Sequence, residues 1–139
     1  MKTLTGTEIK IILQEAKTIA IVGASDKPDR DSFKVMRFLI QCGYNVIPVN
    51  PAYKEIIGKK CYPNLSEIPE HIDIVDIFRR SEDVKQIVLD AVAIKAKTIW
   101  MQLGVVNEEA GQMAVDAGIN VVMDRCIKIE YTSLIAHRS

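Results

Sequence analysis

A glycine, two hydroxyl groups and several basic side chains gather directly after the first apolar run of the chain. Gly23-Ala24-Ser25 follows a β-branched run, and Lys27, Arg30, Ser32 and Lys34 come within the next nine residues. A glycine lets the backbone approach a phosphate closely, while serine, lysine and arginine supply donors and positive charge. This spacing predicts an anion-binding loop of the kind that holds a nucleotide phosphate. The alternative is a tight turn whose charges are merely solvated.

Groups for acid–base or metal chemistry are sparse. The two histidines, His71 and His137, do not follow a predicted strand, so both are expected to be surface residues and no catalytic residue is assigned. The three cysteines form no CxxC pair and have no histidine at zinc spacing. We therefore expect neither a disulfide framework nor a metal site.

Apolar residues follow two alternating patterns along the chain, one typical of buried strands and one typical of helices. These elements position the candidate site residues. Short apolar runs predict buried strands over residues 19–22, 45–49, 72–78, 98–101 and 120–123. Apolar residues at helical spacing predict helices between the strands, and a T-x-x-E capping box at Thr5 predicts another at the start. The helix after the first strand should be capped by Asp31 or Ser32. Residues 52–70 are expected to be mostly loop, with a minor edge strand near 60–62.

Strands that alternate with helices through short connections imply a parallel sheet covered on both faces. The expected fold is α/β, a three-layer, doubly wound, mainly parallel five-stranded sheet of the Rossmann-like type. The chain has 139 residues, the size of one domain, and shows no linker or repeat. A single domain over residues 1–139 is therefore expected.

Charge and hydropathy narrow the classes of partner. Eighteen Lys and Arg residues balance 18 Asp and Glu residues, so a bulk basic field for nucleic acid or anionic lipid is not expected. The longest apolar runs have only a few residues, and no signal-peptide segment is visible. The expectation is a cytoplasmic protein with a small-molecule nucleotide ligand, no membrane and no nucleic acid.

The ends of the predicted strands show which residues should meet. Ligands of open parallel sheets bind beyond the carboxyl ends of the strands, where the strand order reverses. Besides the loop from Gly23, these ends carry Asn50-Pro51, Phe78-Arg79, Gln102-Leu103-Gly104 and Asp124-Arg125-Cys126. All of them are candidates for one ligand site.

A dinucleotide fits this pattern poorly. Ser25 stands where the second glycine of a G-x-G-x-x-G motif would lie. The second strand ends in Asn50, where a dinucleotide fold needs an acidic residue for the ribose. An NAD(P)-binding enzyme is therefore kept only as an alternative.

Five motifs occur in one register along the chain: Ile21-Val22-Gly23-Ala24-Ser25, Val46-Ile47-Pro48-Val49-Asn50-Pro51, Val75-Asp76-Ile77-Phe78-Arg79-Arg80, Trp100-Met101-Gln102-Leu103-Gly104 and Val122-Met123-Asp124-Arg125-Cys126. Over residues 17–131 the chain resembles the small, stand-alone CoA-binding proteins of the YccU type. It is more distantly similar to the N-terminal CoA-binding domain of the succinyl-CoA synthetase alpha subunit and to ADP-forming acetyl-CoA synthetases.

The resemblance implies coenzyme A, or an acyl-CoA, as the ligand. By the family pattern, Gly23-Ala24-Ser25 and Ser32 line the nucleotide phosphates, with Arg30 and Lys34 as counter-charges. Val49-Asn50-Pro51 is placed beside the adenosine.

The remaining implied residues lie toward the pantetheine arm. Phe78 and Arg79 flank the ligand between strands, and Gln102 and Gly104 take the pantetheine side. Core packing is an equal alternative for Phe78, and surface ion pairs are the alternative for Arg79 and its neighbour Arg80. Cys126 is either a thiol able to exchange with that of CoA or, as free cysteines usually are, a buried small residue.

The chain departs from the synthetases in one respect that bears on function. Those enzymes need a second domain with a histidine that becomes phosphorylated, and this sequence leaves no room for it. The expected function is non-catalytic binding of CoA or an acyl-CoA, as a carrier, sensor or subunit. The alternatives are an NAD(P)-binding enzyme and the CoA-binding half of a split acyl-CoA synthetase, whose catalysis a partner protein supplies.

Overall fold

The central sheet is built from runs of residues that are buried on both sides. In the computed structural model, which describes residues 2–136, five parallel strands lie in the order β2-β1-β5-β6-β7. Their bounds are β1 Thr18–Val22, β2 Asn45–Val49, β5 Ile74–Ile77, β6 Thr98–Met101 and β7 Asn120–Val122. Every residue of β1, β5 and β6 is buried, as a sheet covered on both faces requires.

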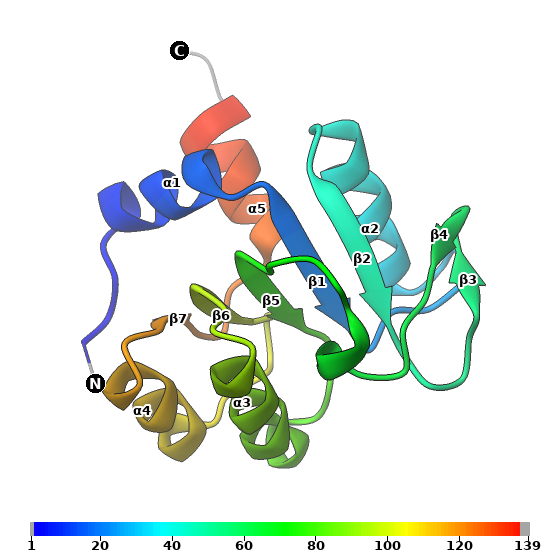
Figure 1. Ribbon diagram of the computed structural model, residues 1–139. Helices are drawn as coiled ribbons and strands as arrows, with labels where there is room; N and C mark the ends of the chain where they lie inside the picture. The colour runs from blue at the N-terminus through cyan, green and yellow to red at the C-terminus, as the bar shows by residue number, and fades with distance from the viewer. Residues whose placement is uncertain (1, 137–139) are drawn as a thin grey trace.

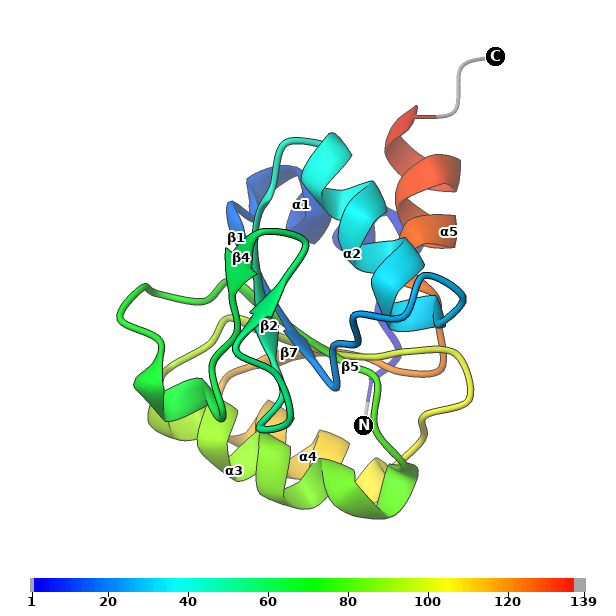
Figure 2. The same cartoon turned by 90° about the vertical axis from the view of Figure 1, so that its right-hand side faces the viewer.

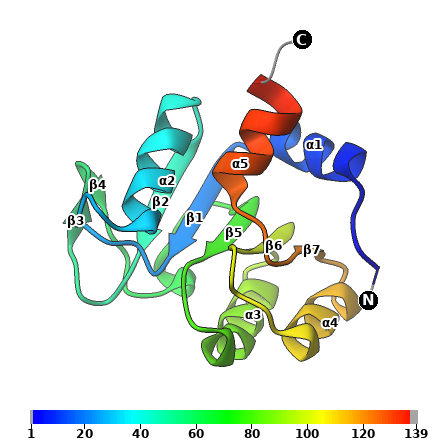
Figure 3. The same ribbon diagram turned by 180° about the vertical axis from the view of Figure 1, so that it is seen from behind.

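Helices cover the two faces of the sheet (Figure 1). One face carries α3 (Val84–Ala93) and α4 (Glu108–Asp116), and the other carries α1 (Gly6–Glu15), α2 (Asp31–Gln41) and α5 (Ile127–Tyr131). The view from behind shows α2 and α5 on the same face (Figure 3), where the rings of Phe38 and Tyr131 meet edge to face at 5.6 Å. The expected three-layer, doubly wound α/β fold is confirmed.

The strand order reverses between β1 and β5. From β1 the chain moves outward to β2, and it then returns to the far side of β1 to form β5, β6 and β7 in turn. Consequently the loop after β1 leads into α2 on one face, and the loop after β5 leads into α3 on the other. The two loops leave the sheet in opposite directions, which opens a crevice at the carboxyl edge.

Helix capping was predicted correctly for α1 and wrongly for α2. In the capping box of α1, the Glu8 N–H donates to Thr5 Oγ1 at 3.1 Å and the Thr5 N–H donates to Glu8 Oε1 at 3.0 Å. In α2 the N-cap residue is Arg30, whose side chain makes no capping bond. A turn in which the Arg30 N–H donates to the Lys27 carbonyl sets this start, so Asp31 is already helical.

Three further elements differ from the sequence prediction. A hairpin of β3 (Glu55–Ile56) and β4 (Lys59–Lys60) lies beside β2 in a region predicted to be mostly loop (Figure 2). Strand β5 is shorter than the predicted 72–78, and α5 with the π-helical turn Thr132–Ala136 was not predicted. No helix in residues 2–136 is long and apolar enough to cross a membrane.

A carboxyl group lies in the middle of the sheet. Asp76 of β5 is fully buried, with Ile21 and Trp100 as its neighbours in register. Neither of its carboxyl oxygens has a hydrogen-bond partner among the described residues. Burial raises the pKa of Asp76 well above its ordinary value, because the charged form is poorly solvated there.

The turn after β1 brings two backbone segments into close contact. Gly23 has φ +90°, and a Cβ added there would lie 2.3 Å from the carbonyl oxygen of Phe78. The Gly23 N–H donates to the Val49 carbonyl at 2.9 Å, so the same residue also ties β1 to β2. Only glycine fits this position without displacing the end of β5.

We predict that Asp76→Leu, which keeps the shape of the side chain, raises the free energy of unfolding by about 1–3 kcal/mol. This gain in the free energy of unfolding should be larger at higher pH. Between the unfolded-state pKa of about 3.9 and the raised pKa of the folded protein, Asp76 is protonated when folded and ionised when unfolded. Unfolding then releases a proton, so rising pH destabilises the natural protein but not the variants. Urea unfolding at several pH values, with Asp76→Asn as a second non-ionising variant, measures the difference. A difference that stays constant from acid to neutral pH would contradict the prediction.

We also predict that Gly23→Ala is more destabilising than Gly43→Ala. Both glycines have a positive φ, but a Cβ at Gly43 meets nothing within 4 Å. The control variant should lose roughly 1–2 kcal/mol for backbone strain alone. Gly23→Ala should lose roughly a further 1–3 kcal/mol, because the Phe78 carbonyl must move. Urea unfolding of both variants tests this, and equal losses would show that the contact with Phe78 is unimportant.

Candidate functional site

The loop after β1 forms one wall of a hollow of about 470 Å³ at the carboxyl edge of the sheet. The opposite wall consists of Asn50, Tyr53 and Phe78, which follow β2 and β5 in the chain. Seven of the residues assigned to the ligand from sequence line this one hollow: Gly23, Ala24, Ser25, Arg30, Ser32, Asn50 and Phe78.

This hollow contains unused hydrogen-bond donors, and its lining includes Lys27 and Arg30 as well as the carboxylates of Asp29 and Asp31. Lys27 and Arg30 are exposed, and no carboxylate among residues 2–136 forms an ion pair with either of them. The backbone N–H groups of Asp31 and Ser32, in the first turn of α2, find no acceptor in the same part of the chain. Free N–H groups at a helix start favour a bound anion. Ser25 shapes the loop, because its Oγ accepts from the Lys27 N–H at 3.1 Å.

A second hollow of about 890 Å³ continues the first along the carboxyl edge. It lies between α2, the loops after β5 and β6, and the first residues of α5, and it contains the predicted residues Lys34, Arg79 and Gln102. Asp31 and Phe78 line both hollows, so the two lie next to each other. The name "cleft" is used below for these two hollows together.

Three of the predicted residues do not line this cleft. The side chain of Val49 packs into the core on the α3 face, because alternate residues of β2 point to opposite faces. Val49 and Pro51 line a separate hollow of about 400 Å³ on that face. Gly104 lines neither hollow of the cleft, and its N–H donates to Asp124 Oδ1 at 2.7 Å.

Two amides at the floor of the cleft fix the backbone around it. Asn50 Nδ2 donates to the Ala24 carbonyl at 2.8 Å, and Asn50 Oδ1 accepts from the Ala52 N–H at 2.9 Å. Gln102 is buried, and its Oε1 accepts from the Ile127 N–H at 3.0 Å, where α5 begins. Asn50 therefore positions the phosphate-type loop, and Gln102 positions the far wall of the cleft.

The structure distinguishes between the alternatives given above for Phe78, Arg79 and Arg80. Arg80 forms ion pairs with Glu82 at 3.1 Å and Asp83 at 3.2 Å, whereas Arg79 forms none within residues 2–136. Phe78 is half-buried, so it packs on the core and also lines the cleft.

Cys126 precedes the first residue of α5 and lines the second hollow. It is partly exposed rather than fully buried.

Several lining residues were missed by the sequence analysis. Tyr53 lies in a segment predicted as loop, and Lys128 and Ile129 lie in the unpredicted α5. For Tyr53 the usable signal was its place just after Asn50-Pro51. The five residues of α5 are too few to show a helical period, so sequence reasoning stopped at Cys126.

His71 lies at the opposite, amino end of the sheet. Its Nε2 is 3.1 Å from the Lys95 carbonyl and its Nδ1 is 3.6 Å from Asp73 Oδ1. His71 is about half exposed, and the whole of β5 separates it from the cleft. His137 lies outside the described residues. Within residues 2–136 no group of three His, Cys, Asp or Glu side chains could hold a metal ion.

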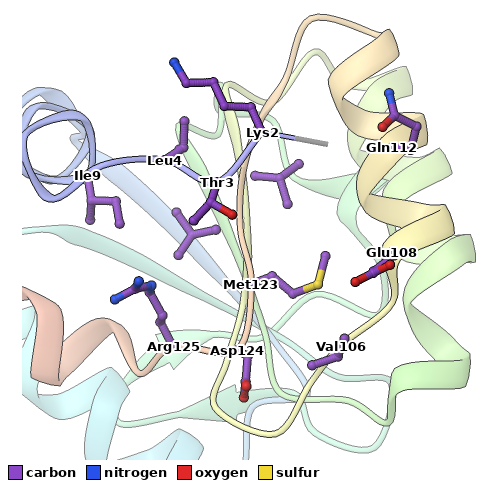
Figure 4. A pocket seen from close by; sticks show the side chains of 12 residues that line it. Lys2, Thr3, Leu4, Ile9, Val106, Glu108, Gln112, Met123, Asp124 and Arg125 are labelled. Atoms are coloured by element: carbon purple, nitrogen blue, oxygen red, sulfur yellow. The ribbon is translucent and has the colours of Figure 1, made fainter.

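A further hollow of about 450 Å³ lies beside the edge strand β7, away from the loop after β1. In Figure 4 the N-terminal residues Lys2, Thr3 and Leu4 lie across from Glu108 and Gln112 of α4. Asp124 and Arg125, two of the candidates at the strand ends, line this hollow, but none of the residues assigned to the CoA phosphates, adenosine or pantetheine does. The cleft is therefore the place where the sequence motifs and a cavity coincide.

Comparison with known proteins agrees with the sequence motifs. A family model described as "CoA binding domain" matches residues 17–132. The uncharacterized protein YneT of Bacillus subtilis is 45% identical over 131 residues, which cover 94% of this chain and 97% of YneT. A solved structure of a hypothetical protein from Pyrococcus horikoshii has a TM-score of 0.93 and 40% identity, with 97% of each chain covered.

A larger enzyme contains a related segment. ADP-forming acetate–CoA ligase I of Archaeoglobus fulgidus is 28% identical over 128 residues. The match covers 85% of this chain but only 19% of that ligase. The chain is thus homologous to the CoA-binding part of such synthetases, and it belongs to the CoA binding domain family.

Proposed function

We propose that this protein binds coenzyme A or an acyl-CoA in the cleft at the carboxyl edge of its sheet and does not itself catalyse a reaction. The observation that carries the proposal is that two adjacent hollows of different character share Asp31 and Phe78. One end offers free N–H groups and basic side chains, as a phosphate-rich nucleotide requires. The other end is a larger, more apolar hollow that suits a flexible arm.

The phosphates occupy the first hollow in this proposal. The N–H groups of Asp31 and Ser32 and the charges of Lys27 and Arg30 are directed to the same space. CoA carries a pyrophosphate and a 3′-phosphate, so it has more negative charge to place there than NAD has. Tyr53 in the same hollow provides an aromatic surface on which the adenine can stack.

The pantetheine arm occupies the second hollow. It would pass Phe78 and run along Val35 of α2 and Val105 of the loop after β6, both of which are buried apolar residues. Arg79, which has no ion-pair partner among the described residues, lines the second hollow and also the separate hollow on the α3 face. The thiol would then lie near α5.

The polar groups at the site favour the proposed binding of CoA over the binding of NAD(P). Asn50, which follows β2, has no carboxylate to offer a ribose diol, and each end of its amide already makes one backbone hydrogen bond, to Ala24 and Ala52. A non-catalytic role is supported by the place of His71, which the length of β5 separates from the cleft.

We predict that titration calorimetry detects binding of CoA, weaker binding of 3′-dephospho-CoA, and little binding of NAD. Arg30→Glu should weaken CoA binding by about tenfold or more, because a charge-assisted contact is replaced by repulsion. Lys10→Glu makes the same charge change on exposed α1 and should leave the affinity unchanged. Tight NAD binding without a CoA signal, or equal effects of the two variants, would overturn the proposal.

A separate prediction concerns catalysis. The isolated protein, incubated with labelled ATP, an acid and CoA, should yield neither labelled protein nor a new thioester, since no histidine of residues 2–136 lies in the cleft. Phosphoprotein analysis and chromatography of the products measure both quantities. A labelled product that disappears in His71→Ala would instead indicate a reduced synthetase.

A further inference from the structure

The largest exposed apolar side chains at the cleft stand together at its far end. Leu103, in the loop after β6, is 67% exposed, and Ile129, in α5, is 59% exposed. They have the greatest exposure among the large apolar residues of the described chain, and both line the second hollow. Exposed apolar side chains that share one concave surface mark a binding site more often than scattered ones do.

These two residues extend an apolar wall that begins inside the cleft. Val35, Phe78 and Val105 line the same hollow as Leu103 and Ile129. Val35 and Val105 are buried, so Leu103 and Ile129 are the exposed part of this apolar lining. A pantetheine arm that starts at the first hollow would cover the inner part of this wall.

A free thiol is too small to cover the outer part. The terminal atom of CoA is a single sulfur, whereas Leu103 and Ile129 present two branched side chains to water. An apolar acyl chain joined to that sulfur as a thioester would continue along the wall and remove both side chains from water.

We propose that the ligand is an acyl-CoA whose apolar acyl chain lies against Leu103 and Ile129. This inference rests on the proposed function, because it assumes that the nucleotide end of the ligand lies in the first hollow. It adds the class of thioester: an unbranched or branched hydrocarbon acyl group of several carbons rather than acetyl or free CoA.

Calorimetric titration of the whole protein with CoA and with acetyl-, butyryl-, hexanoyl- and octanoyl-CoA tests the inference. Affinity should rise about twofold or more for each added methylene, since complete burial of one methylene corresponds to about fourfold. In the double variant Leu103→Ser, Ile129→Ser, the ratio of octanoyl-CoA affinity to CoA affinity should fall by at least tenfold. Leu89→Ser, on exposed α3 away from the cleft, should keep the ratio of the natural protein.

The outcomes separate this inference from the proposed function. Affinities that are measurable for CoA but equal for all chain lengths would overturn the acyl inference alone. The same holds for a double variant that keeps the natural ratio, because apolar adsorption elsewhere would then explain the tighter binding. No binding of any of the five compounds would overturn the proposed function itself.

Discussion

The close approach of Gly23 to the carbonyl of Phe78 is the contact on which the arrangement of the cleft depends. It joins the ends of β1 and β5 at the point where the strand order reverses, and it leaves no space for a side chain between them. The loop after β1 is therefore held against the sheet before it turns into α2. The ring of Phe78 then stands where both hollows of the cleft meet, so this backbone contact fixes their relative position.

The two ends of the sheet use their polar groups differently. At the amino end, the carboxylate of Asp73 accepts hydrogen bonds from the N–H groups of Lys17 and Thr18 at 2.8 and 2.9 Å. Burial opposes the charge of Asp73, but these hydrogen bonds and nearby Lys97 outweigh it, so the pKa is lowered. Backbone donors there are consumed within the fold. At the carboxyl end, donors of the loop and of α2 are left for a ligand.

The sequence predicted what depends on periodicity and missed what depends on distant contacts. Strands β1, β5 and β6 are short, mostly apolar runs, so their number, direction and burial followed from the sequence, although β5 includes Asp76. Parallel strands then brought most of the predicted site together. Val49 was misplaced because a motif does not specify to which face a side chain points. The start of α5 was missed because the acceptor that supports it comes from Gln102, 25 residues earlier.

The polar side chains of the cleft mostly hold backbone in place. Asn50 bonds the loop at Ala24, Ser25 bonds its own turn, and Gln102 bonds the first residue of α5. These hydrogen bonds give all three side chains a structural role in the walls of the cleft. What stays free in the cleft is backbone N–H, fixed positive charge and apolar surface. These are the means of recognising a charged, flexible ligand, as the proposed binding of CoA or an acyl-CoA requires.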